Sequence, residues 1–369
     1  HHIILDGWSA QIVLREVFTL HEAHRAGRAT ELESPRPYGD FIRWLATRDR
    51  ARAGALWRRE LGGVEAPTPL PADRAAPLDD GGPRFRWCQI KLAGDEVAQL
   101  AAFAPQHQLT MSTLVQGAWA LLLSLYSGQT DVLFGLTASG RSAPISGIER
   151  MAGLFINTIP VRARVRGDAP VLGWLQALQA YVAELLEHEH SPLVEIQAHS
   201  DVRGVPLFES LVVFENYPVE AVEVSPAEAQ EKAFRVVNGS YIGDPPYPLT
   251  VIAAFDGELH LKIGHDRRRV DDRAVDRMMG QIATLLQGFA RSPGAEVRDL
   301  PPLTADEEGT LLRWTEDRRG SPDGAALPDA SPSTRNDRVN RRATPDAGGH
   351  DAAYEAPRHA VEEGLARIW

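Results

Sequence analysis

Apolar residues recur at helical spacing in two stretches near the start of the chain. Val13, Val17 and Leu20 lie three or four positions apart, which predicts an amphipathic helix over residues 10–26. The same period continues through residues 38–61 and predicts a second helix there. Both helices would turn one apolar face toward a core.

From residue 85 onward the chain alternates between strand-like and helix-like segments. Residues 62–84 are rich in Pro, Gly and Asp and predict a connection between two lobes. The predicted strands are 85–92, 131–137, 155–165, 207–214, 232–241, 247–256 and 258–265. The predicted helices are 94–104, 110–126, 171–187 and 271–290, of which 110–126 is apolar on most faces and therefore central. This order predicts an α/β or α+β sandwich.

The pattern of apolar residues changes in the C-terminal part of the chain. Thr304 and Glu307 have the spacing of a capping box and predict a short helix that ends near Trp314. Residues 316–352 contain too few large apolar side chains to offset the entropy of ordering, and therefore predict a flexible linker. Helical periodicity returns in residues 353–369.

Composition and charge narrow the classes of function. The 369 residues suggest two or three domains, at about 100–200 residues each. The single cysteine excludes an internal disulfide framework and a cysteine-based zinc site. A net charge of −11 argues against nucleic-acid binding through phosphate attraction. No apolar run reaches the roughly 18 residues of a membrane helix and no signal peptide is evident, so we expect a cytoplasmic protein without membrane partners.

The most specific chemical signal is the opening segment HHIILDGWS, residues 1–9. It places two imidazoles and one carboxylate on a short strand and turn. A positioned imidazole is able to manage a proton during acyl transfer, while a carboxylate at the end of the strand fixes local geometry through a cation. From these residues alone, a buried histidine pair at a strand end remains an equal alternative.

This segment resembles the HHxxxDG motif of the condensation domains of nonribosomal peptide synthetases, and further elements follow in that family's order. Residues 38–44 are similar to the YxDFxxW element, and residues 139–158 to the SGR…GIE…GxFxNT stretch. Residues 188–195 form a weak version of HQDxPFE, and residues 205–218 resemble PLF…FENYP. The resemblance covers roughly residues 1–295.

The resemblance implies a chloramphenicol acetyltransferase-like, two-lobed condensation fold whose first lobe is incomplete, because the chain opens on His1. Residues 1–70 would be the remnant of the N-terminal lobe and residues 71–295 the C-terminal lobe. Residues 296–315 would be a linker helix that follows the condensation domain, and residues 316–352 the flexible linker. Residues 353–369 resemble the start of a carrier domain.

The resemblance also implies roles for single residues. His2 is expected to be the catalytic residue, which orients the acceptor amine and takes its proton. The residues expected to support the motif are His1, Asp6, Gly7 and Arg141, with Arg141 and Asp6 forming an ion pair. The residues expected to line a substrate tunnel are Trp8, Ser9, Ser139 and Asn157.

The function that follows from the resemblance is amide-bond formation between a carrier-bound acyl or peptidyl thioester and a carrier-bound aminoacyl acceptor. The chain would bind no cofactor or metal of its own, because phosphopantetheine arrives on partner carrier domains. The expected partners are upstream donor and downstream acceptor carrier domains and an adenylation domain, with no nucleic acid. The open alternatives are an epimerisation domain, a free-standing acyltransferase, and a catalytically inactive docking or scaffold fragment.

Overall fold

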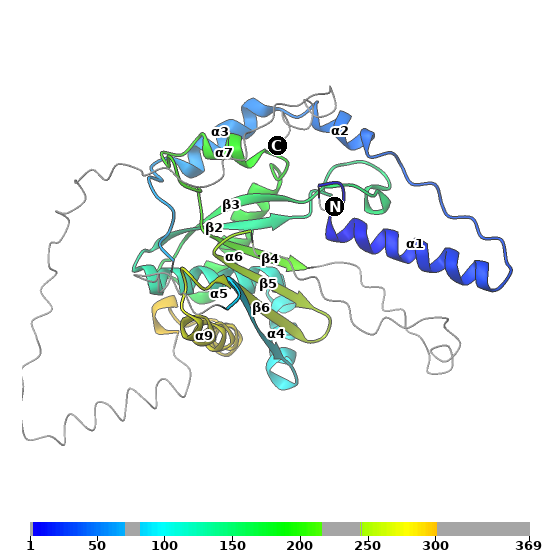
Figure 1. Ribbon diagram of the computed structural model, residues 1–369. Coiled ribbons are helices and arrows are strands. Elements are labelled where there is room, and N and C mark those ends of the chain that lie inside the picture. Colours follow the sequence, from blue (N-terminus) through cyan, green and yellow to red (C-terminus); the bar gives the residue numbers. More distant parts are fainter. Residues whose placement is uncertain (1–2, 71–81, 216–243, 245, 301–369) are drawn as a thin grey trace, which may run out of the picture. The chain divides into compact units, whose positions relative to one another are not determined.

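A mixed β-sheet is the centre of the part of the chain that the structure describes. The computed structural model describes residues 3–70, 82–215, 244 and 246–300. The sheet has six strands in the order β1-β6-β5-β4-β2-β3 (Figure 1). The strands are β1 (Phe85–Leu92), β2 (Asp131–Ala138), β3 (Asn157–Arg164), β4 (Ser210–Glu215), β5 (Leu249–Phe255) and β6 (Leu259–Asp266).

The strand pairing explains which strands are most apolar. β4 lies between β2 and β5 and runs parallel to both, whereas the pairs β1–β6, β5–β6 and β2–β3 are antiparallel. Parallel strands are normally covered on both faces and read as continuous apolar runs. The run LVVF in β4 and the buried interior of β2 follow this rule. β1, at one edge, instead has exposed residues interspersed among half-buried ones, and Leu92 at its end is its buried residue.

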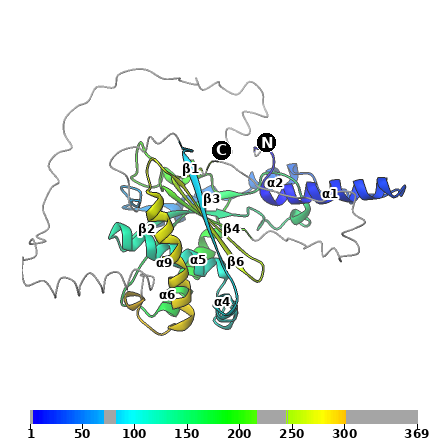
Figure 2. The same cartoon turned by 60° about the horizontal axis from the view of Figure 1, so that its bottom comes forward.

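Helices cover the sheet and connect its strands. The helices are α1 (Gly7–Arg25), α2 (Gly39–Leu45), α3 (Arg50–Leu61), α4 (Asp95–Gln106), α5 (Met111–Ser127), α6 (Val171–Leu186), α7 (Leu193–Gln197) and α9 (Asp272–Arg291), with 3-10 turns at Ile148–Arg150 and Val297–Asp299. α9 packs against α4, α5 and β1, while α6 contacts α5 and β3 (Figure 2).

α5 is the central helix of the core, as its sequence predicts. Residues 113–123 are all buried. The helix begins where the Thr110 side chain accepts a hydrogen bond from the Thr113 N–H at 3.0 Å, and it ends at Gly128, which has a φ of 69°. A polar N-cap and a left-handed glycine are the two signals that stop such an apolar run from extending further.

The helix predicted over residues 38–61 is two helices. α2 and α3 are separated by residues 46–49, where Asp49 accepts a hydrogen bond from the Arg52 N–H at 3.0 Å and so caps α3. Apolar periodicity continues across this break, which is why the pattern predicts a single helix. The strand predicted over residues 232–241 lies outside the described residues.

The chain divides into two units, residues 1–302 and residues 303–369. The second unit, which contains the predicted flexible linker and carrier-like segment, lies outside the described residues together with the helix predicted near residue 304. The domain boundaries predicted from the sequence therefore stay predictions.

α1 buries less of its apolar surface than its periodicity predicts. The helix extends away from the sheet (Figure 1), and Val13, Leu14, Val17 and Leu20 are 37–50% exposed. Its buried residues are Ser9, Ile12 and Ala23. α1 is thus held mainly at its N-terminal end.

Among the described residues no single helix has the length and apolar character to cross a membrane; α4 and α5 meet that test only as a pair bent by 107°.

The close packing of Gly135 in β2 gives a test of this core. A Cβ added at Gly135 would lie 2.3 Å from the ring of Phe208, which is 1% exposed. We expect Gly135→Ala to lower the free energy of unfolding by about 1–3 kcal/mol in a denaturant titration, because the buried ring must move. The matched control is Gly173→Ala in α6, where a Cβ meets nothing within 4 Å. Equal effects of the two substitutions would contradict the packing described here.

Candidate active site

The structure brings the predicted site residues that it describes into two neighbouring segments. Residues 6–9 form the N-cap and first residues of α1, and residues 139–156 form the loop between β2 and β3, with Asn157 as the first residue of β3. His1 and His2 lie outside the described residues, so the catalytic role of His2 stays a prediction. The structure does show what holds the end of the motif that follows them.

Asp6 connects the motif to the β2–β3 loop. It is 1% exposed and serves as the N-cap of α1, since its Oδ1 accepts a hydrogen bond from the Ser9 N–H at 2.7 Å. Its Oδ2 accepts from the Phe155 N–H at 3.0 Å, and its own N–H donates to the Gly153 carbonyl at 3.2 Å. Both carboxylate oxygens and the backbone of Asp6 are therefore engaged.

Arg141 forms the ion pair with Asp6 that the resemblance implies. Its Nη2 lies 3.3 Å from Asp6 Oδ1, and the two side chains are 5% and 0% exposed. The same nitrogen donates to Ser9 Oγ at 2.9 Å, while Nη1 donates to the carbonyls of Ile148 at 2.6 Å and Met151 at 3.0 Å. Burial lowers the pKa of the Arg141 guanidinium, and the nearby Asp6 carboxylate opposes that shift.

Aromatic rings enclose the guanidinium. Its central carbon lies 3.9 Å from the ring centre of Phe155 and 5.3 Å from that of Trp8, which are distances of cation–π contacts. The Trp8 indole N–H donates to the Glu149 carbonyl at 2.8 Å. Trp8 thus fixes the same loop that Arg141 fixes.

Tyr38 also contacts the β2–β3 loop. Its hydroxyl donates to the Leu154 carbonyl, and its ring meets Phe155 edge-on with centres 5.0 Å apart. Burial, with a smaller contribution from Asp6, raises the pKa of Tyr38 to about 12, so the hydroxyl keeps its proton. A Cβ at Gly153 would lie 2.2 Å from the Tyr38 ring. Gly153 is therefore required for space, because any side chain there would collide with that ring.

The four residues expected to line a tunnel make contacts that hold loops together. Ser9 is fully buried, and its hydroxyl donates to the Gly153 carbonyl at 2.7 Å. Ser139 Oγ accepts from the Arg141 N–H at 3.3 Å. Asn157 Nδ2 donates to the carbonyls of Glu189 and Ser191, both at 2.7 Å. The tunnel role of these residues and of Trp8, like the role of Gly7 at the first position of α1, stays a prediction.

Glu189, a buried carboxyl group in the turn between α6 and α7, was not predicted from the sequence. It is 2% exposed and accepts hydrogen bonds from residues on both sides of Arg141. The only signal in the sequence is its place in the weak HQDxPFE element. The adjacent His190 packs edge-on against Trp44, with ring centres 4.7 Å apart.

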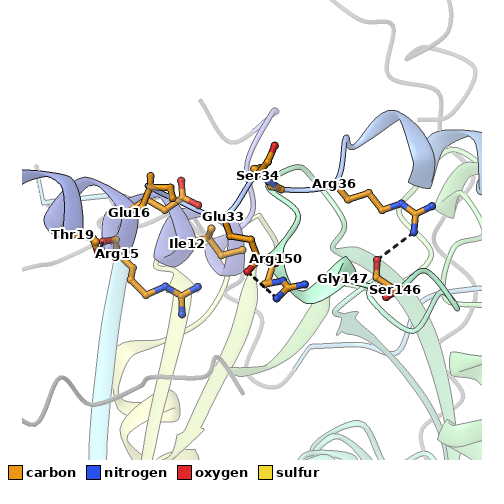
Figure 3. Close-up of a pocket in the computed structure, with 12 residues that line it drawn as sticks. Ile12, Arg15, Glu16, Thr19, Glu33, Ser34, Arg36, Ser146, Gly147 and Arg150 are labelled. Carbon is orange, nitrogen blue, oxygen red and sulfur yellow. Dashed lines mark hydrogen bonds and ion pairs between the residues drawn. The ribbon is translucent and has the colours of Figure 1, made fainter. Parts of the chain in front are cut away.

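A separate groove of about 320 Å³ lies between α1, residues 32–36 and residues 146–150. Arg150 forms an ion pair with Glu33 at 3.0 Å, and Arg36 donates a hydrogen bond to the Ser146 carbonyl at 3.4 Å (Figure 3). Both contacts connect residues 32–36 to residues 146–150. Trp8, Ser9, Ser139, Arg141 and Asn157 do not line this groove.

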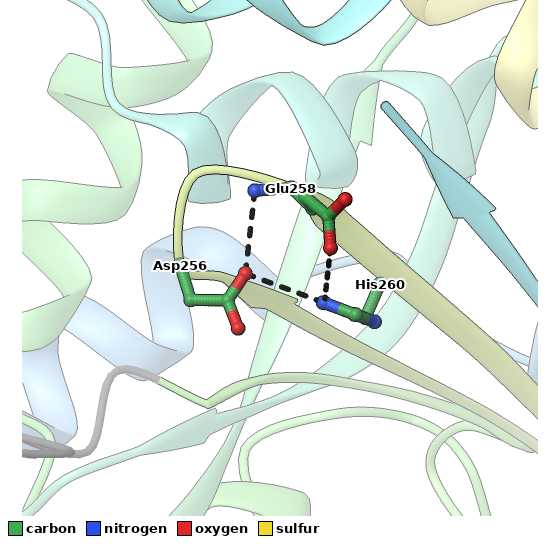
Figure 4. Close-up of side chains that lie close together, drawn as sticks. All are labelled: Asp256, Glu258 and His260. Atoms are coloured by element: carbon green, nitrogen blue, oxygen red, sulfur yellow. Dashed lines mark hydrogen bonds and ion pairs between the residues drawn. The ribbon is translucent and has the colours of Figure 1, made fainter. Parts of the chain in front are cut away.

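Among the described residues, a cluster at the β5–β6 hairpin has the donor atoms of a metal ligand set. Asp256, Glu258 and His260 offer ligand atoms within 4.8 Å of one another at the β5–β6 hairpin (Figure 4). Asp256 Oδ1 accepts from the Glu258 N–H at 3.2 Å, and Glu258 also pairs with the Lys91 ammonium at 2.5 Å. Turn formation and this ion pair account for the arrangement.

Comparison with known proteins decides the family. The family model described as "Condensation domain" matches residues 1–312. The chain belongs to the condensation-domain family. This family forms amide bonds in nonribosomal peptide synthetases, as the motifs implied.

The relatives are parts of large synthetases. The chain is 38% identical over 332 residues to one of the linear gramicidin synthase subunits of Brevibacillus parabrevis, covering 89% of this chain and 6% of the relative. It is 38% identical over 316 residues to chondramide synthase cmdD of Chondromyces crocatus, covering 85% of this chain and 8% of the relative. The chain thus spans less than a tenth of the length of either relative.

Solved structures establish the fold class. The X-domain from teicoplanin biosynthesis matches with a TM-score of 0.64 and 22% identity over 82% of this chain and 70% of that chain. The first condensation domain of the calcium-dependent antibiotic synthetase, in complex with a substrate analogue, matches with a TM-score of 0.63 and 17% identity over 82% and 66%. The predicted chloramphenicol acetyltransferase-like fold is confirmed.

The Asp6–Arg141 pair should show strong energetic coupling. We expect Asp6→Ala and Arg141→Ala each to lower the free energy of unfolding by about 3–5 kcal/mol, because each leaves a buried charge without its partner. The double variant should lose less than the sum of the two.

The control for this cycle is the exposed pair Arg52–Glu187, at 3.6 Å with side chains 71% and 65% exposed. Its coupling should be about 0–1 kcal/mol. Strict additivity at Asp6 and Arg141 in denaturant titrations would contradict a buried pair.

His190 should make stability fall in mild acid. Burial, followed by the charge of Arg48, lowers the pKa of His190 from 6.5 to about 4. As the pH falls from about 6.5 to about 4, the unfolded chain takes up a proton that the folded chain does not, so the free energy of unfolding decreases over this window. We expect His190→Phe to flatten that part of the stability curve relative to its value at about pH 7.5. Parallel curves for the variant and the unmodified protein would contradict this account.

Proposed function

We propose that this condensation domain catalyses attack of a carrier-bound aminoacyl amine on a carrier-bound acyl or peptidyl thioester. The C–N bond forms, the C–S bond breaks, and the proton lost by the amine ends on the departing thiolate. The observation that supports this most is the HHxxxDG motif, in a chain matched by the condensation family, with its Asp6 locked to Arg141 in a buried ion pair.

His2 is the residue to which we assign proton management. An α-amine has a pKa near about 8, so a fair fraction is already neutral at about pH 7 and a strong base is not required. His2 would orient the amine and carry its proton, with positioning supplying much of the rate. His1 would support the segment that carries His2.

Asp6 is poorly suited to act as the base itself. One oxygen accepts from Ser9 and lies beside Arg141, and the other accepts from Phe155. Both carboxylate oxygens are thus already engaged within the protein, and neither is free to accept a proton from a substrate. Its contribution is therefore to hold the start of α1, and with it the motif, in a fixed position.

The reaction needs partners from the same assembly line. Donor and acceptor carrier domains would each deliver a phosphopantetheine arm, and an adenylation domain would load the acceptor. The relatives support this view because they are synthetases more than ten times as long as the matched segment.

A docking function is the second candidate. One structure with this fold, at a TM-score of 0.66 and 23% identity, is described as a complex of the X-domain and OxyB from teicoplanin biosynthesis. A domain of this fold is thus found bound to another protein. Product formation separates the two functions, since a docking module forms no amide.

Replacement of His2 tests the proposed function. In the synthetase polypeptide that contains this domain, supplied with acyl-carrier and aminoacyl-carrier thioesters, we expect His2→Ala to abolish amide product detected by mass spectrometry. The fold should remain, and His1→Ala should reduce product less. His24→Ala, on the exposed part of α1, is the matched control and should keep full activity. Full turnover by His2→Ala would contradict the assignment.

A further inference from the structure

Glu189 lies in the turn between α6 and α7, far from the motif in sequence but close to it through one loop. Its side chain is 3% exposed. The backbone of the turn is fixed from β3, because Asn157 Nδ2 donates to the carbonyls of Glu189 and Ser191. The carboxyl group therefore starts from a well-held backbone.

The Glu189 carboxyl group accepts hydrogen bonds on both sides of Arg141. Its Oε2 accepts from the Gly140 N–H at 3.2 Å, and its Oε1 accepts from the Ser142 N–H at 3.2 Å and from the Ser142 hydroxyl. Hydrogen bonds to an ionised acceptor are roughly twice as strong as neutral ones. The backbone that carries Arg141 is thus held immediately before and after that residue.

A carboxylate fits this place better than any other side chain of its size. Three donors converge on two oxygens, so both oxygens must accept. A glutamine would offer one acceptor oxygen and would direct its NH₂ group at a donor. A buried charge is costly unless hydrogen bonds satisfy it, and these three bonds do so.

Gly140 brings the loop close enough for this contact. Its φ is +67°, and a Cβ there would lie 1.7 Å from the Phe155 carbonyl oxygen. The loop therefore passes directly against the residue whose N–H donates to Asp6. A small shift of residues 140–142 would move the Arg141 guanidinium away from its acceptors.

We propose that Glu189 is a positioning residue for amide-bond formation: its buried carboxyl group clamps Gly140 and Ser142 and so aims Arg141 at Asp6, at the base of the HHxxxDG motif. This role rests on the proposed function. Glu189 does not touch the reacting atoms; it acts through Arg141.

Glu189→Gln is the first test, made in the complete synthetase polypeptide with both carrier-bound substrates. We expect kcat to fall by about 10- to 100-fold, because a displaced loop misplaces the motif, while KM for each carrier changes little. The matched control is Glu187→Gln in the same turn, where the side chain is 65% exposed. The control should retain the unmodified kcat.

A second measurement separates positioning from general loss of structure. If Glu189 acts through Arg141, the loss caused by Glu189→Gln should shrink in an Arg141→Lys background, so that the combined loss is smaller than the product of the single losses. Should Glu189→Gln fail to fold, Ser142→Ala removes one donor to the same carboxyl group and should show the same dependence on Arg141, with a smaller loss.

The outcomes are distinct. Full activity of Glu189→Gln, or losses that multiply independently of Arg141, would overturn the positioning role while leaving amide formation intact. An unmodified protein that forms no amide would overturn the proposed function, and the positioning role with it.

Discussion

The structure around the motif depends on one buried ion pair. Asp6 and Arg141 are 135 positions apart in the sequence, yet their charges meet where both side chains are almost fully covered. Charges removed from water must be paired and hydrogen-bonded, or they destabilise the fold by several kcal/mol. Ser9, Phe155 and the carbonyls of Ile148 and Met151 meet that requirement. The start of α1 is therefore locked to the β2–β3 loop.

The β2–β3 strand pair holds the loop that carries Arg141 in place. β2 and β3 pair along their whole length, so that Ala138 lies opposite Asn157 and the loop between them leaves and returns at a fixed point. From there the chain places Arg141, the Ile148–Arg150 turn and Phe155 around Asp6. Glu189 and Asn157 add a second attachment from the α6–α7 turn. Asp6 is thus held beside the end of two fully paired strands, and a site that depends on positioning needs such support.

Local patterns predicted the fold well where burial follows periodicity. Strand β1 and helices α5 and α6 agree with their predicted ranges within a few residues, because each has one consistent apolar pattern. The break between α2 and α3 was missed, since it depends on the Asp49 cap and not on apolar spacing.

The sequence identified some residues of the site and missed others, and the difference has a physical reason. The family motif identified Asp6 and Arg141, whose pairing is intrinsic to that motif. Glu189 was missed because its partners, two backbone N–H groups and the Ser142 hydroxyl, lie almost fifty positions away and form no spacing pattern with it in the sequence. The spatial need for Gly153 likewise depends on the Tyr38 ring, which only the fold brings over it.

Hydrogen exchange in an Asp6→Asn variant tests the central claim most directly, because the amides of Ser9 and Phe155 both donate to Asp6. If the buried pair locks the two segments together, peptides that cover residues 3–12 and 148–157 should exchange at least about tenfold faster in the variant, while peptides from β5 and β6 keep their protection. Unchanged exchange in both segments, or an equal increase across the whole sheet, would contradict the account.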